Sequence, residues 1–165
     1  MKPQTCCFTG HRHLPAEKIE SIKKRLYAEI DNLYQRGVRS FISGDAIGFD
    51  QMTAAAIVRK KEQGYDLRLV FALPCRNQSA KWTIDQRKHY QSLINKADEI
   101  IYVSENFTPD CMKKRNFYMV DNSDICICAL LHEKSGTGQT VRHAKGRGVK
   151  IINVAFTNPE NQSFP

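Results

Sequence analysis

The sequence lacks the long apolar run of a membrane helix, and only one of its 165 residues is a tryptophan. A membrane-spanning helix needs about 18 or more consecutive apolar residues. The longest apolar run here, residues 125–131, has the length of a strand. The amino-terminal residues 1–15 contain no long apolar stretch with a small-residue cleavage site, so no signal peptide is indicated. We therefore expect a cytoplasmic protein that does not bind membranes.

Patterns typical of metal centres and of hydrolytic triads are also missing. The six cysteines show no zinc-site spacing, the five histidines form no H-x-x-x-H pair, and no G-x-S-x-G nucleophile turn is present. Cys6, Cys7, Cys126 and Cys128 lie inside apolar runs, where cysteine is usually a small buried hydrophobic residue. The sequence predicts reduced packing cysteines, no metal site and no cofactor.

The composition is that of an ordinary globular chain with an excess of positive charge. Hydrophobic residues make up 41% and charged residues 25%, and the net charge is +8. A basic surface attracts the phosphates of nucleotides or nucleic acids. The basic residues are spread over four runs, however, at 23–25, 59–61, 113–115 and 142–150, and three of these runs are typical of solvated helix faces.

Strand-like and helix-like segments alternate along the chain. Apolar strand-like runs are predicted at 5–9, 38–43, 67–73, 99–103, 125–131 and 149–154. Helices are predicted between them, at 15–36, 49–61, 79–95, 109–120 and 137–147. This order predicts an α/β, Rossmann-like, doubly wound and mostly parallel sheet with helices on both faces. We expect one domain over residues 1–154 and a polar C-terminal tail over 155–165.

Ligands of such sheets bind beyond the carboxyl ends of the strands, and three loops there contain glycine. The first is Thr9-Gly10-His11-Arg12-His13, in which Arg12 can grip a phosphate, although the alternative is a glycine turn with solvated basic residues. The second runs from Ser43 to Asp50 and contains Gly44, Asp45 and Gly48. Its glycines favour an anion at a helix N-terminus, while the two aspartates could accept bonds from ribose hydroxyls, and Asp50 could simply cap the helix.

The third loop follows the strand-like run 125–131 and opens a helix. It contains Gly136, Thr137, Gly138, Gln139 and Thr140, a pattern that can cradle phosphate but also suits a flexible turn with an N-cap. The two glycine loops that open helices together favour a nucleotide-sized anion. Weaker candidates are Arg76 beside Trp82, which could frame a base or pack under its loop, and a set before the fifth strand: Asn116, Tyr118, Asp121 and Asp124.

The pattern Ser43-Gly44-x-Ala46-x-Gly48-x-Asp50, followed by Ala54, resembles the SLOG superfamily, which joins the Smf/DprA DNA-processing proteins and the LOG-type nucleotide hydrolases. Three further segments resemble its small stand-alone YpsA-like branch: 8–12, 73–74 and 136–140. The resemblance covers residues 4–154. It implies a Rossmann-like fold, a homo-oligomer and a pocket for a nucleotide-derived ligand. By match, the pocket residues are Thr9, Gly10, Arg12, Ser43, Gly44, Gly48, Asp50, Gly136, Thr137, Gly138 and Thr140.

One departure from the LOG pattern P-G-G-x-G-T-x-x-E bears on catalysis. Arg142 stands where the catalytic glutamate of the LOG-type hydrolases would fall, and a cation cannot stabilise a developing oxocarbenium ion. The leading hypothesis is therefore a binding protein that senses a nucleotide or nucleotide derivative. The alternatives are an N-glycosidic-bond hydrolase or transferase that uses Asp45 or Asp50, and a DprA-like protein that binds single-stranded DNA.

Overall fold

The protein is described by a computed structural model that covers residues 4–157, in which six parallel strands form one sheet. In chain order the strands are β1 (Thr5–Gly10), β2 (Ser40–Ser43), β3 (Arg68–Leu73), β4 (Glu99–Tyr102), β5 (Ile125–Ala129) and β6 (Lys150–Asn153). The helices between them are α1 (Ala16–Gln35), α2 (Phe49–Glu62), α3 (Ile84–Ile94), α4 (Cys111–Asp121) and α5 (Gly136–Gly146). The predicted Rossmann-like α/β fold is confirmed.

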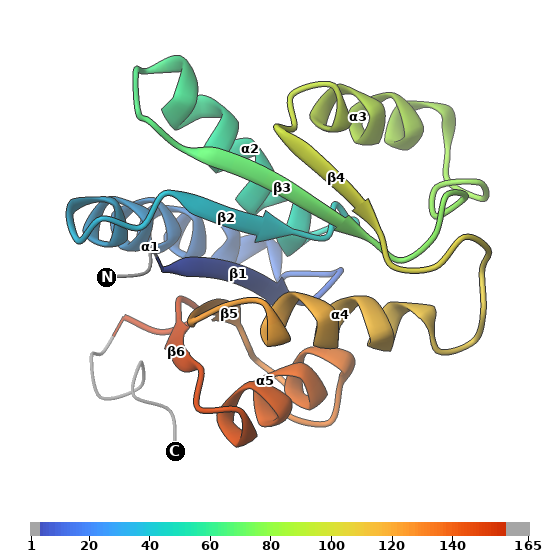
Figure 1. The fold of residues 1–165 in the computed structure, drawn as a ribbon. Coiled ribbons are helices and arrows are strands. Elements are labelled where there is room, and N and C mark those ends of the chain that lie inside the picture. Colours follow the sequence, from blue (N-terminus) through green and yellow to red (C-terminus); the bar gives the residue numbers. More distant parts are fainter. Residues whose placement is uncertain (1–3, 158–165) are drawn as a thin grey trace.

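The helices cover both faces of the sheet (Figure 1). Buried residues of α1, α2 and α3 pack in one hydrophobic cluster with one face, and those of α4 and α5 pack in a second cluster with the other. The central strands are apolar on both faces, as expected for strands covered from two sides.

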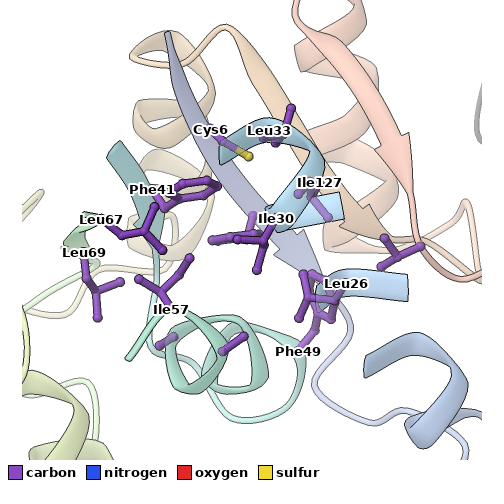
Figure 2. Packing of buried hydrophobic residues seen from close by; sticks show 14 of the residues in the cluster. Cys6, Leu26, Ile30, Leu33, Phe41, Phe49, Ile57, Leu67, Leu69 and Ile127 are labelled. Carbon is purple, nitrogen blue, oxygen red and sulfur yellow. The ribbon is translucent and has the colours of Figure 1, made fainter. Parts of the chain in front are cut away.

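The larger cluster lies between the sheet and the first two helices. Figure 2 shows Leu26 and Ile30 of α1 and Ile57 of α2 directed towards the same apolar space as Phe41 of β2. The α1 residues recur at three- and four-residue intervals, so one stripe of that helix faces the sheet. Each such side chain contributes about 1.5–3 kcal/mol when it is fully buried.

The element boundaries agree with the predictions except at α3. That helix was expected from residue 79, but it begins at Ile84. Thr83 forms a capping box with Gln86, since its hydroxyl accepts the Gln86 N–H and the Gln86 side chain accepts the Thr83 N–H. Two such bonds fix a helix start, and residues 76–80 form turns instead.

The strand order β4-β3-β2-β1-β5-β6 reverses its direction of growth between β1 and β5. Because every strand is parallel, all carboxyl ends meet at one edge, towards which the arrows of Figure 1 point. The loops after β1 and β5 flank the reversal, where ligands of open α/β sheets bind. The fold therefore brings two of the three predicted loops together at the crevice and places the third, after β2, beside it.

Three further expectations concern membranes, cysteines and the tail. Within residues 4–157, no helix combines the length and the apolarity that crossing a bilayer requires. All six cysteines are buried and free, as predicted. Of the predicted tail, Ala155 is buried and its N–H donates to the Asn153 side chain, whereas residues 158–165 lie outside the described part of the chain.

Candidate functional site

The loops after β1 and β5 are joined at the crevice by a histidine. Nε2 of His11 accepts the backbone N–H groups of Leu131 (2.9 Å) and His132 (3.3 Å). An imidazole nitrogen that accepts hydrogen bonds is unprotonated. Burial, with His132 nearby, lowers the pKa of His11, which is consistent with that role. His11 thus holds the loops after β1 and β5 together, while Arg12 and His13 are exposed.

The amino end of α2 is closed by the chain's own backbone. The Phe49 N–H donates to the His11 carbonyl. Gly48 has φ +95°, and a methyl group there would overlap the carbonyl of Arg12. The loop after β1 therefore occupies the space at this helix end in which sequence reasoning placed an anion.

The other two early glycines also make room for the protein itself. A methyl group at Gly10 would overlap the Phe49 ring, and one at Gly44 would overlap the Arg115 guanidinium. Each glycine is thus explained by packing rather than by the approach of a ligand. Thr9 is buried in β1 beside Cys128 of β5.

Ser43 and Asp50 brace the first turn of α2 from within. The Ser43 hydroxyl donates to the Asp50 carbonyl (2.9 Å), as does the Thr53 hydroxyl (2.6 Å). The Asp50 side chain is buried, and its carboxylate accepts the Ala46 N–H (3.4 Å). Burial raises the pKa of Asp50, while the positive charge of Arg115 opposes that rise.

Arg115 of α4 corrects the interpretation of residues 113–115 as a solvated helix face. Its guanidinium is buried and donates to the carbonyls of Gly44 (2.7 Å) and Ala72 (3.3 Å), and it lies 3.8 Å from the Asp50 carboxylate. Cys111, Arg115 and Met119 all face inwards. Their four-residue spacing was a signal in the sequence that could have identified Arg115 as buried.

Asp45 is fully buried, and neither of its carboxylate oxygens has a hydrogen-bond partner among the described residues. Burial, with the negative charge of Asp50 adding to it, raises the pKa of Asp45 to about 8. The residue also has φ +54°, a left-handed conformation that is uncommon outside glycine. A left-handed backbone and an unpaired buried carboxyl group with a raised pKa are together features of functional positions.

Gln78, in the loop after β3, covers the same region. Its amide nitrogen donates to the Gly44 carbonyl (3.4 Å) and to the Tyr90 hydroxyl (3.2 Å), and its amide oxygen has no partner within residues 4–157. Trp82 packs edge-on against Tyr90. Arg76 does not join them, because it pairs with Glu105 and stacks on Tyr102.

The amino end of α5, in contrast, is open. The Ser135 hydroxyl caps it by accepting the Gly138 N–H (3.0 Å), and Gly138 packs against the Glu133 carbonyl. Gly136 is exposed, and a methyl group there would meet no other atom. In the described part of the chain, the N–H groups of Gly136 and Thr137 have no partner, so they are available to an anion.

The other residues of this loop support its shape. The Thr140 hydroxyl donates to the Gly136 carbonyl, and Arg142 donates to the Glu133 carbonyl (3.0 Å). Thr137 is buried and Gln139 is half-buried. Arg142 therefore braces the loop from the position at which the LOG-type hydrolases have their glutamate.

The four weaker candidates lie elsewhere or have other partners. The Asn116 side chain accepts from Arg115, and Tyr118 packs on the second hydrophobic cluster. Asp121 pairs with His143 of α5 and with Arg147, the C-cap residue of that helix. Asp124 accepts the N–H of Thr5, at the edge of the sheet opposite the crevice.

Two solved structures of DNA processing protein A resemble this fold. One, from Helicobacter pylori, is described in terms of a unique single-stranded DNA binding mode. It has a TM-score of 0.65 and 18% identity over 92% of this chain and 65% of that one. The other, from Streptococcus pneumoniae, has a TM-score of 0.70 and 13% identity over 98% of this chain and 54% of that one. This chain therefore spans about half to two-thirds of those chains, and at such identities the likeness concerns the fold.

Sequence relatives lie closer than these structures. An uncharacterized SPbeta prophage-derived protein, YoqJ of Bacillus subtilis (strain 168), is 32% identical over 137 residues, which are 75% of this chain and 80% of YoqJ. A UPF0398 protein of Bacillus cereus is 24% identical over 133 residues, 79% of this chain and 72% of its own length. The YpsA family model, described as the YspA SLOG family, matches residues 6–148. The chain therefore belongs to the YspA SLOG family.

Proposed function

We propose that the protein binds the phosphate of a nucleotide or nucleotide derivative at the carboxyl edge of its sheet and acts as a sensor or regulator. The observation that carries the proposal is the amino end of α5 beside the strand-order reversal, where the N–H groups of Gly136 and Thr137 have no partner among residues 4–157. Two free N–H groups and the helix dipole favour an anion at this position.

The charge around this helix end supports the same ligand. Arg12 and His132 are exposed on the two loops that His11 joins, and Lys134 is exposed immediately before the Ser135 cap. Arginine can hold a phosphate through two parallel bonds, and lysine acts as a mobile point charge. The exposed Glu133 carboxylate opposes them, so a net attraction depends on Arg12 and Lys134.

The states of three residues favour binding over hydrolysis of an N-glycosidic bond. Arg142 is used to hold the Glu133 carbonyl. Asp45, with a pKa of about 8, carries a proton at neutral pH, and a neutral acid cannot stabilise a cationic transition state as a carboxylate does. Asp50 is buried against Arg115, away from the open helix end.

Calorimetric titration of a nucleoside and its monophosphate tests the proposal. Guanosine monophosphate should bind at least about tenfold more tightly than guanosine, because only the nucleotide has the phosphate that α5 would hold. Lys134→Ala should lower the ratio of the affinities for nucleotide and nucleoside several-fold. Lys88→Ala, at an exposed position of α3, should leave that ratio unchanged. Equal affinity for nucleoside and nucleotide, or no binding of any nucleotide, would overturn the proposal.

Single-stranded DNA is the second candidate ligand, because the similar fold of the Helicobacter pylori protein is described in a single-stranded DNA binding mode. The net charge of +8 agrees with a polyanionic ligand. Fluorescence anisotropy with a labelled 20-nucleotide oligonucleotide, at low and at physiological salt, separates the two candidates. DNA binding that falls steeply with salt, without measurable mononucleotide binding, would favour this second function.

A further inference from the structure

A second group of polar residues lies beyond the α5 site, at the carboxyl ends of β2 and β3. Arg115 and Gln78 meet at the carbonyl of Gly44, Asp50 and Tyr90 are linked to them, and Asp45 is the next residue of the chain; we name these five residues, Asp45, Asp50, Gln78, Tyr90 and Arg115, the Gly44 cluster. Arg115 and Gln78 both donate to that carbonyl. Gln78 links it to the Tyr90 hydroxyl. Burial raises the pKa of Tyr90 to about 12, and the charge of Asp45 adds to that rise.

The charges of the Gly44 cluster do not balance. Arg115 is its one cation among the described residues, and Asp50 is the carboxylate nearest to it (3.8 Å). Asp45 is a second buried carboxyl group, and the Gln51 amide and Arg115 only partly offset the effect of burial, which raises its pKa to about 8. A buried carboxylate needs either a proton or donors from outside the protein.

The hydrogen bonds of the cluster are also incomplete. Both Asp45 oxygens and the Gln78 amide oxygen lack a partner among the described residues. Buried polar groups in native structures are nearly always paired, so three unpaired acceptors in one region require an explanation. A ligand with several N–H donors would satisfy them together.

We infer that the Gly44 cluster recognises the amino-bearing edge of guanine and so selects the base of the bound nucleotide. This inference rests on the proposed function. Guanine presents its N1–H and its two N2–H groups side by side. These donors match one further acceptor and both oxygens of Asp45, which releases its proton to solvent when the base binds. Adenine and cytosine also have one amino group on that edge, but beside it they have an acceptor nitrogen in place of the N–H of guanine. That nitrogen would lie opposite an Asp45 oxygen.

The separation of the two regions suits one nucleotide. β2, which leads to Asp45, and β5, which leads to α5, are separated by β1 alone. Two strand spacings amount to about 10 Å, which is comparable with the span from the phosphorus of a nucleotide to the far edge of its base. A phosphate at Gly136 therefore leaves the base within reach of Asp45.

Entry of the base requires Gln78 to move. Asp45 has no exposed surface, and the Gln78 amide lies over the same carbonyl. The two bonds of that amide are 3.4 and 3.2 Å long, at the weak end of the normal range. Residues 76–80 form turns rather than regular structure, so the side chain can be displaced without unwinding a helix.

Calorimetry with three purine nucleotides tests the inference on the unaltered protein. Inosine monophosphate lacks the N2 amino group of guanosine monophosphate, and xanthosine monophosphate has a carbonyl in its place. Guanosine monophosphate should bind at least about tenfold more tightly than either. A site whose buried acceptors pair with the N–H groups of a ligand rejects an analogue that lacks one of these groups. Equal affinity for guanosine and inosine monophosphates overturns the inference but leaves the proposed function intact.

Asp45→Asn then tests the residue. An asparagine presents one acceptor and one donor, so the variant should lose about tenfold for guanosine monophosphate and gain for xanthosine monophosphate. Asp66→Asn, at an exposed position before β3, is the matched control and should keep the original order. An unchanged order in Asp45→Asn overturns the inference. If no nucleotide binds the unaltered protein, the proposed function fails and the inference fails with it.

Discussion

The two helices that begin at the carboxyl edge with glycine loops differ in what fills their amino ends. At α2, the backbone of His11 and Arg12 closes the helix end, and Gly10, Gly44 and Gly48 each make room for a neighbouring residue of the protein. At α5, Gly138 packs in the same way, but Gly136 faces open space. Two similar sequence patterns thus have different structural roles, because contacts from other loops decide whether an N–H group remains free.

Arg115→Met should cause the largest loss of stability, because it removes the buried cation that contacts the loop between β2 and α2. Asp50 would be left buried without its neighbouring positive charge, and the Gly44 carbonyl would lose a donor. Loss of one partner of a buried ion pair costs about 3–5 kcal/mol. Chemical denaturation measures the change. Lys114→Met, at the exposed neighbouring residue, should cost less than about 1 kcal/mol, and similar losses for both variants would contradict the buried role of Arg115.

The same glycine-to-alanine change at Gly48 and Gly136 should give opposite results. At Gly48 the new methyl group overlaps Arg12 and the backbone has positive φ, so we expect a loss of about 2–4 kcal/mol. At Gly136, in the first turn of α5, alanine should be neutral or stabilise by up to about 1 kcal/mol. Thermal and urea unfolding check both. A tolerated Gly48→Ala would show that the α2 end is not closed by packing.

The free energy of unfolding of the protein should fall as pH rises from 6 to 9. The pKa of Asp45 rises from 3.8 to about 8 on folding. The folded state therefore holds a proton that the unfolded state has already lost. This contribution is complete below pH 4 and is lost as pH rises through 8, by on the order of 2 kcal/mol between pH 6 and 9.

Urea unfolding of the unaltered protein and of Asp45→Asn, compared at pH 6 and pH 9, isolates that contribution. Asp45→Asn should flatten the pH dependence, because an amide does not titrate in this range. Asp66→Asn should keep the slope of the unaltered protein, since the residue is exposed. Equal slopes in all three proteins would mean that Asp45 is ionised in the folded state at neutral pH.

The fold could be predicted because its signals are local. Apolar strand-sized runs, the helical spacing in α1 and the glycines after the helices each depend on neighbours within a few residues. The late start of α3 was missed because the capping box at Thr83 and Gln86 lies inside a polar stretch of helix formers. That signal was also local, and it was readable in the sequence.

The candidate site was less predictable, because its roles depend on contacts between distant parts of the chain. Arg115 lies next to two exposed lysines, and only its position between Cys111 and Met119 indicates burial. The closure of the α2 end depends on the backbone of Arg12, which comes from another loop. The unpaired state of Asp45 depends on α4 and on the loop that carries Gln78. The spacing of apolar residues along the sequence does not indicate contacts between such distant residues.

Calorimetric titration of Gly136→Asp and Gly136→Ala with guanosine monophosphate tests whether the amino end of α5 binds the phosphate. An aspartate in the first turn of α5 should maintain or raise the unfolding temperature, since it complements the helix dipole, yet it should repel a phosphate at that end. We expect Gly136→Asp to bind guanosine monophosphate at least about tenfold more weakly than the unaltered protein. Gly136→Ala should bind it nearly as tightly as the unaltered protein, and both variants should be folded. Equal affinity in the two variants would contradict a phosphate site at the amino end of α5.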